Sequence, residues 1–161
     1  MVSRILSNVV VGISGSGASV HAAKYAIMMA KLYKCRVTAV YVVDTATLKQ
    51  LTMSKIFVSD ESSEFERNLH ANGERYLSLV EELAKQKEIK IEKELRSGAV
   101  WTEILETAAE KKSDLIVLGG WEKDRDVKDI ISHIHHEILL HSKCPVLIVK
   151  EPDIDVLYRH L

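Results

Sequence analysis

The chain has 161 residues, of which 47% are apolar and 28% are charged, and its formal net charge at pH 7 is -1. These proportions are typical of one globular domain with a full core and exclude a disordered chain. A net charge so near zero supplies no field that would attract nucleic acid or anionic lipid, so we expect neither as a partner.

Signals for membrane insertion or export are missing from the sequence pattern. No apolar run approaches the ~18 residues that span a bilayer, and the first residues lack a distinct apolar core followed by a small-residue cleavage site. The two cysteines, Cys35 and Cys144, each precede an apolar run and do not suggest a disulfide framework. We therefore expect a cytoplasmic protein with reduced, buried thiols.

Apolar runs without alternation predict strands that are buried on both faces of a parallel sheet. The first such run is Asn8–Ile13, and the second covers residues 35–43. Between them, alanines and Ile27 recur at helical spacing after Ser19, which is placed to cap the helix. Strand, helix and strand within about 35 residues form a right-handed βαβ unit.

The middle of the chain is less regular. Residues 44–63 show no clear period, and a connection of this length is usually functional or mobile; we expect at most a short helical turn there, or a cover for the sheet edge. A helical apolar face then runs from residue 63 to residue 87, and residues 89–95 suggest a half-exposed outer strand. Gly98 ends this strand, and Val100 begins the next helical pattern.

The last βαβ unit spans residues 113–150. Its first strand ends in Gly119 and Gly120, a charged loop and a helical pattern follow, and Pro145 begins the final apolar run. Five strands alternating with four helices predict a doubly wound five-stranded parallel α/β sheet, with helices on both faces, in a single domain. We assign this domain to residues 1–150 and expect residues 151–161 to form a C-terminal tail, either an arm on a partner subunit or a frayed end.

A cluster rich in glycine and serine at residues 12–17 follows the first strand and opens a helix, where a phosphate could bind. The cluster does not match the dinucleotide fingerprint, because Val20 stands at the third glycine position, and no Gly-Lys-Ser/Thr follows to make a P-loop. Two interpretations stay open: a flexible turn with a helix cap, or a loop that lines a ligand site.

Histidines crowd the last helical pattern, and His133 and Glu137 lie four residues apart on one flank of it. This spacing can hold a metal ion, but the pair lacks the remaining ligands of a site. The sequence HEILLH at residues 136–141 has one residue too many for an H-E-x-x-H motif. We expect a solvated or interfacial helix flank and no metal, and keep as an alternative a metal-dependent enzyme that uses His133, His136 and Glu137.

Three stretches give the chain a resemblance to a known family. They are VVVGISGSGAS at residues 9–19, CRVTAVYVVD at residues 35–44, and SDLIVLGG at residues 113–120, which is followed at the family's interval by CPVLIVK. Together they resemble the universal stress protein family over residues 8–150. The resemblance implies a five-stranded parallel α/β sheet and a homodimer formed through the last strand. An uncovered apolar edge of that kind invites pairing, and here it comprises Val146, Leu147, Ile148 and Val149.

Some members of this family bind ATP through a G-x2-G-x9-G-Ser/Thr loop and an acidic residue after the first strand. Here Glu122, Ser132 and His133 replace the second glycine, the third glycine and the Ser/Thr. Ser14 stands in place of the acidic residue. Glycines let backbone N–H groups approach phosphate oxygens, whereas unit charges ~4 Å apart, such as Glu122 and a phosphate, repel by about 4 kcal/mol at an effective dielectric of about 20. We therefore do not expect ATP to bind in the family's usual way.

The adenosine end of the family's pocket can survive this loss and accept a smaller or uncharged ligand. Its candidate lining comprises Ile13, Ser14, Val42, Leu118, Gly119 and Gly120. We expect a non-catalytic stress-response protein that has no cofactor and acts as a homodimer through protein partners or a small ligand. The alternative is a switch that binds ATP or AMP through a modified phosphate loop.

Overall fold

The structure, a computed structural model, describes residues 5–56, 58–120 and 125–161, and the side chains of all of these except residues 59 and 125–132. Strands and helices alternate along most of the described chain. In order they are β1 (Asn8–Ile13), α1 (Gly17–Tyr33), β2 (Arg36–Asp44), α2 (Thr45–Met53), α3 (Ser59–Gln86), β3 (Glu92–Gly98), α4 (Val100–Glu110), β4 (Leu115–Gly119), α5 (Arg125–His141), β5 (Val146–Val149) and α6 (Ile154–Arg159).

The strands form one sheet with the order β3-β2-β1-β4-β5, and every neighbouring pair is parallel. From β1 the chain winds outward through β2 to β3, and it then crosses back to continue through β4 to β5 on the other side. Val10 of β1 lies in register between Thr38 of β2 and Ile116 of β4. The predicted doubly wound parallel fold is confirmed, and its switch point lies between β1 and β4.

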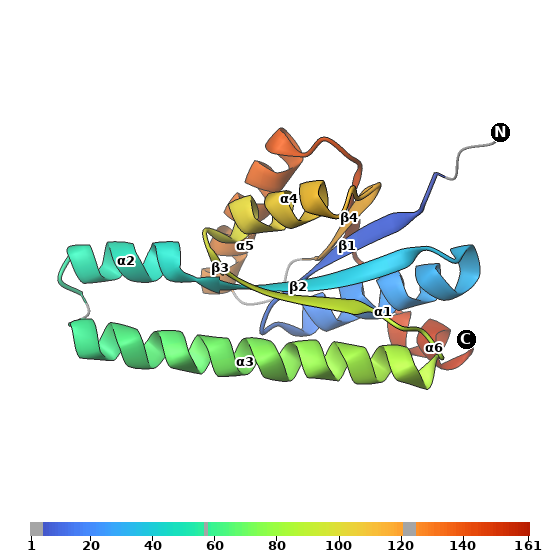
Figure 1. Ribbon diagram of the computed structural model, residues 1–161, viewed down its shortest axis with the longest axis horizontal. Coiled ribbons are helices and arrows are strands. Elements are labelled where there is room, and N and C mark those ends of the chain that lie inside the picture. The colour runs from blue at the N-terminus through green and yellow to red at the C-terminus, as the bar shows by residue number, and fades with distance from the viewer. Residues whose placement is uncertain (1–4, 57, 121–124) are drawn as a thin grey trace.

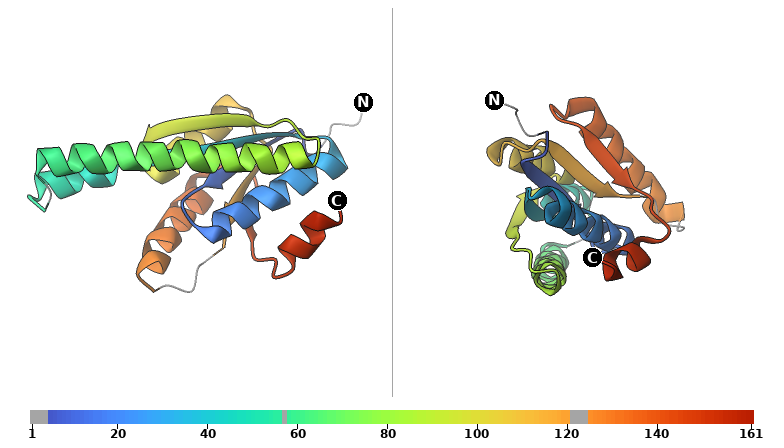
Figure 2. Two further views of the ribbon diagram at one scale, coloured as in Figure 1. Left: turned by 90° about the horizontal axis from the view of Figure 1, so that it is seen from below. Right: turned by 90° about the vertical axis from the view of Figure 1, so that its right-hand side faces the viewer.

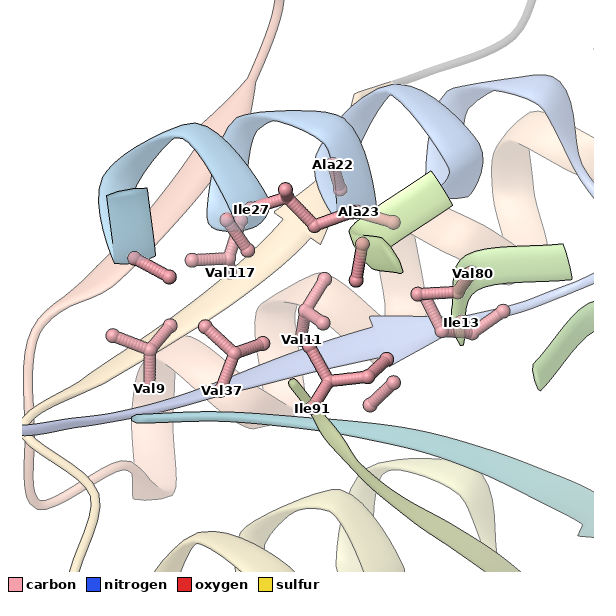
Figure 3. Packing of buried hydrophobic residues seen from close by; sticks show 14 of the residues in the cluster. Val9, Val11, Ile13, Ala22, Ala23, Ile27, Val37, Val80, Ile91 and Val117 are labelled. Carbon is pink, nitrogen blue, oxygen red and sulfur yellow. The ribbon is translucent and has the colours of Figure 1, made fainter. Parts of the chain in front are cut away.

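Side chains of the central strands alternate between the two faces of the sheet, so the core consists of two hydrophobic clusters. Val9 and Val11 belong to the cluster under α1, α3 and α6, whereas Val10 belongs to the cluster under α4 and α5. Figure 2 shows these two groups of helices on opposite sides of the sheet. In Figure 3, Ile27 of α1 faces Val117 of β4 within the first cluster. Each such side chain, when fully buried, contributes about 1.5–3 kcal/mol.

Helix α1 has a cap at each end. The Ser16 Oγ accepts a hydrogen bond from the Ser19 backbone N–H at 3.2 Å, which satisfies one of the free donors at the helix start. Lys34 ends the helix in the left-handed conformation with φ 59°, and its N–H donates to the Ala30 carbonyl at 2.9 Å. Small side chains on the buried face let this helix lie close to the sheet; they are Ala22, Ala23, Ala26 and Ala30.

The segment at residues 44–63, where we expected at most a short helical turn, is largely helical. The Asp44 Oδ1 caps α2 by accepting a hydrogen bond from the Thr47 N–H at 3.1 Å. Helix α3 begins at Ser59, before the predicted start at residue 63, and is 28 residues long. Figure 1 shows α2 and the first part of α3 side by side, projecting together beyond the sheet.

Charged residues cover the outer strand β3, which lies at the edge of the sheet as its charge alternation predicted. The Arg96 Nε lies 2.8 Å from the Glu103 Oε2, and its Nη1 lies 2.8 Å from the Glu110 Oε2. The Glu110 carboxylate is exposed, and an ion pair with such a partner contributes at most about 1 kcal/mol to stability. Charges on an edge strand also oppose pairing with another chain, so β3 is a poor edge for self-association.

The last residues fold back on the domain, so the expectation of an arm or a frayed end for residues 151–161 is wrong. Ile154 and Tyr158 of α6 are buried in the cluster that contains α1 and α3. The Tyr158 hydroxyl donates to the Leu83 carbonyl of α3, and the Lys24 Nζ of α1 lies 2.6 Å from the Asp155 Oδ1. The apolar pair at i, i+4 on a short helix gives this tail a face to bury.

Candidate functional site

A hollow of about 80 Å³ lies where the carboxyl ends of β1 and β4 meet, at the switch point of the sheet. Three kinds of residue line it, together with one histidine. They are the apolar Ile13, Val100, Ile104, Leu118 and Ile134, the hydroxyl residues Ser14, Ser16 and Ser19, the glycines Gly12, Gly119 and Gly120, and His135. Open α/β sheets bind their ligands in this position.

Five of the six residues predicted to line a pocket come together in this hollow, and they are Ile13, Ser14, Leu118, Gly119 and Gly120. Val42 does not line it. This side chain lies on β2, one strand away from the switch point, and packs in the hydrophobic cluster beneath α4. It therefore has a structural role in the core.

Gly119 is required by a close approach of two backbones. A Cβ at this position would lie 2.5 Å from both the carbonyl carbon and the carbonyl oxygen of Ala18. The end of β4 can therefore lie against the start of α1 only if residue 119 has no side chain. This packing brings the first loop and the end of β4 together and so forms the walls of the hollow.

The serine-rich loop after β1 both caps α1 and lines the hollow. The Ser14 and Ser16 hydroxyl oxygens lie 2.9 Å apart; Ser14 is exposed and Ser16 is half-buried. The buried Ser19 Oγ lies 2.8 Å from the Ser14 carbonyl oxygen, to which it donates. The Tyr76 hydroxyl of α3 donates to the Gly15 carbonyl at 3.3 Å. The loop can therefore be both a turn that caps a helix and a wall of the hollow, the two interpretations that the sequence left open.

His135 belongs to the hollow, and the sequence analysis did not select it. It lies on α5 and is buried. Burial lowers the pKa of the imidazole below its usual value, and a hydrogen bond with the backbone of Gly119 opposes this shift. His135 is therefore neutral at neutral pH. Its spacing of three residues from the buried Ile138 was the signal that could have found it.

The residues at which the ATP motif is lost are only partly described. Glu122 lies outside the described residues, and Ser132 lies in α5 with a side chain that is also outside them. His133 is exposed on α5. The structure thus places His133 on the helix surface, while the inference from Glu122 and Ser132 rests on the sequence.

The histidines of α5 do not assemble with Glu137 as the metal-enzyme alternative requires. The Glu137 Oε2 lies 3.5 Å from the Nδ1 of His141, and His133 and His136 are exposed. The ring of His141 stacks on Trp101 of α4 with centroids 5.1 Å apart. Within the described ranges, no three histidine, cysteine, aspartate or glutamate side chains gather in a way that could hold a metal ion.

The predicted dimer strand β5 lies at the sheet edge opposite β3, with β4 as its neighbour. Val146, Leu147 and Ile148 are half-buried, and Val149 is buried.

None of the helices that the structure describes is both long enough and apolar enough to cross a membrane.

The fold and the hollow define a doubly wound α/β protein with a small cleft at its switch point. Comparison with known proteins assigns it to a family within this class: the model of the universal stress protein family matches residues 6–150, and the chain belongs to that family. The universal stress protein MJ0531 of Methanocaldococcus jannaschii is 32% identical over 148 residues, which is 92% of this chain and 84% of the relative.

Solved structures of the family share this fold. A universal stress protein from Burkholderia pseudomallei superposes with a TM-score of 0.72 at 22% identity, over 92% of this chain and 99% of that one. A structure from Archaeoglobus fulgidus in complex with dAMP has a TM-score of 0.64 at 15% identity, over 91% and 100% of the two chains. One from Arabidopsis thaliana with AMP bound has a TM-score of 0.64 at 13% identity, over 91% and 94%.

Proposed function

We propose that this universal stress protein is a non-catalytic binding protein of the cytoplasm, which holds the uncharged part of a small adenine-type ligand in the hollow and acts as a homodimer on protein partners. The lining of the hollow carries the ligand part of this proposal. Among its described side chains none is charged at neutral pH, because burial lowers the pKa of His135. Apolar walls with a few hydroxyls suit a neutral ring and disfavour a polyanion.

The size of the hollow supports the same ligand class. Its volume of about 80 Å³ is well below the roughly 300–1,000 Å³ of typical ligand pockets, so one ring enters and the rest of the ligand stays outside. The hydroxyls of the exposed Ser14 and the half-buried Ser16 can bond a ribose hydroxyl or one phosphate beside the start of α1. Two further phosphates would need cations or glycine N–H groups, and Glu122 replaces a glycine of the family's loop.

A nucleotide-binding switch is the second candidate function. The observation that favours it is that relatives with this fold carry AMP or dAMP. Both ligands have a single phosphate, so they also fit a hollow that recognises mainly the adenosine part. A switch that responds to ATP must bind ATP at least as well as AMP, and this requirement separates the two functions.

Filling the hollow should abolish AMP binding. In Val100→Phe the larger side chain occupies the space from α4, and we expect the AMP affinity measured by calorimetry to fall roughly tenfold or more. Ala109→Phe places the same ring on an exposed position of the same helix and should bind AMP like the wild type. Equal affinity of the two variants would contradict ligand binding in this hollow.

The dimer part of the proposal rests on the contrast between the two edges of the sheet. Strand β3 carries the ion pairs of Arg96, whereas β5 presents four apolar residues and is hydrogen-bonded to β4 on one side. Unpaired strand edges without charge are the ones that associate.

Both thiols are free, Cys35 being buried and Cys144 half-buried, as expected in the reducing cytoplasm.

We expect Ile148→Lys to convert the dimer into monomers. The substitution puts a charge in the middle of β5, where pairing with a second β5 would bury it. Light scattering should therefore report half the wild-type mass. Leu32→Lys, at an exposed position near the end of α1, serves as the control and should leave the mass unchanged. A dimeric Ile148→Lys variant or a monomeric wild type would refute the interface.

A further inference from the structure

The helical hairpin of α2 and the first part of α3 ends in exposed apolar side chains. It projects beyond the sheet between β2 and β3 (Figure 1). We call these side chains the hairpin tip, and their exposed fractions are 74% for Met53, 63% for Ile56, 62% for Val58 and 46% for Phe65. Single exposed apolar residues are ordinary, but several gathered on one projection are typical of interaction sites.

Acidic residues surround the hairpin tip. Asp60, Glu61, Glu64 and Glu66 are exposed, and the basic residues between positions 53 and 67 are Lys55 and Arg67, which are exposed as well. No ion pair involves these four carboxylates in the part of the chain that the structure describes. Glu61, Glu64 and Phe65 line one shallow groove together with Asn68. The groove therefore combines part of an apolar side chain with two carboxylates that form no ion pair among the described residues.

We propose that the hairpin tip and this acidic groove dock the apolar face of a basic amphipathic helix on a partner protein. An apolar patch rimmed by carboxylates complements a helix whose apolar stripe is flanked by lysine or arginine. A second copy of the tip is disfavoured, because on each copy the four carboxylates outnumber the two cations, Lys55 and Arg67, and the resulting negative charges repel one another. An anionic lipid surface is disfavoured for the same reason.

The tip adds a specific partner site to the function proposed above. Binding through two tips at once rests on the proposed dimer. The hairpin joins β2 and β3, on the side of the sheet opposite β5. A dimer formed through β5 therefore leaves one tip free at each outer side. Two tips acting together would increase the apparent affinity for a partner that presents several helices, without any new contact.

The test uses three synthetic 18-residue peptides and fluorescence anisotropy at low salt. One places leucine and lysine so that a helix has one apolar and one basic face, one has the same composition in scrambled order, and one replaces lysine by glutamate. We expect the first peptide to bind, and the scrambled and acidic peptides to bind at least roughly tenfold more weakly. Equal binding of the scrambled peptide, or no binding of the first, would overturn the proposal.

Matched double variants assign the binding to the tip. Glu61→Lys with Glu64→Lys, and separately Ile56→Ser with Val58→Ser, should each weaken binding of the first peptide roughly tenfold. The controls keep wild-type affinity: they are Glu74→Lys with Glu82→Lys on the second half of α3, and Leu139→Ser with Leu140→Ser on α5, all at exposed positions. Unchanged affinity in the tip variants would place the peptide elsewhere and refute the proposal.

Two further outcomes separate this inference from the proposed dimer. Ile148→Lys should keep the wild-type affinity for peptide in solution and lose only the slow dissociation from a peptide-coated surface that bivalency provides. Loss of the solution affinity would show that the tip does not bind by itself. A mass that rises with concentration in the wild type, but not in Ile56→Ser with Val58→Ser, would identify a second copy as the occupant and overturn the proposed partner.

Discussion

Gly119→Ala is expected to lower the free energy of unfolding by about 2–3 kcal/mol. The added Cβ would lie 2.5 Å from the Ala18 carbonyl group and 2.8 Å from the Ser19 nitrogen. All of these are backbone atoms, so no side chain can rotate away to relieve the contact. The end of β4 or the start of α1 must move, and such a movement also opens or closes the hollow.

Denaturant unfolding measures this loss, with Gly15→Ala as the control. A Cβ at residue 15 would meet only the Tyr76 ring at 3.7 Å, which is an ordinary van der Waals distance. The control should therefore change stability by less than about 1 kcal/mol. If both variants unfold at the same denaturant concentration as the wild type, β4 and α1 do not approach each other as the structure describes.

Ile154→Ala is expected to lower the free energy of unfolding by about 3 kcal/mol, although residue 154 lies only seven positions before Leu161. Its side chain is buried in the same cluster as the core residues of α1 and α3. Removing three carbon atoms there leaves a cavity under α6. Because α6 belongs to this core, thermal unfolding should remain a single transition at a lower temperature.

Val156→Ala is the matched control for α6. Val156 is exposed on the same helix, and its truncation should change stability by no more than about 0.5 kcal/mol. An Ile154→Ala variant as stable as this control would mean that the last residues do not belong to the core and form an arm or a frayed end.

Strands β1, β4 and β5 could be predicted from the sequence because they are short apolar runs next to glycine, serine or proline, whereas β2 was predicted from its β-branched and aromatic residues and β3 from its charge alternation. Helix starts were harder to place. Asp44 is both the last residue of β2 and the cap of α2, so strand and helix follow without a loop that composition could reveal. Val58, which precedes α3, makes no side-chain cap bond, so Asp60 and Glu61 in the first turn are the signal for a helix start at residue 59.

The candidate site was predictable where it depends on strand ends and was missed where it depends on helices. Ile13 and Gly119 are the last residues of β1 and β4, and the carboxyl ends of parallel strands lie at the same edge of the sheet. Val42 lies on the same face of the sheet as Leu118 but on β2, one strand away from the switch point, and the residues of β2 give no sign of this strand order. His135 was missed because the buried face of α5 was read from its aliphatic residues alone, although His135 lies three residues before the buried Ile138. Whether Val42 and His135 line the hollow depends on contacts between elements that are far apart in the sequence.

Calorimetric titration of nucleotide-free protein with AMP, and with ATP in the presence and absence of magnesium, tests most directly whether the hollow recognises adenosine without a phosphate loop. The account predicts that AMP binds and that ATP binds at least roughly tenfold more weakly. ATP bound as tightly as AMP, or more tightly, would contradict it, because the chain would then possess a site for the phosphates in spite of Glu122.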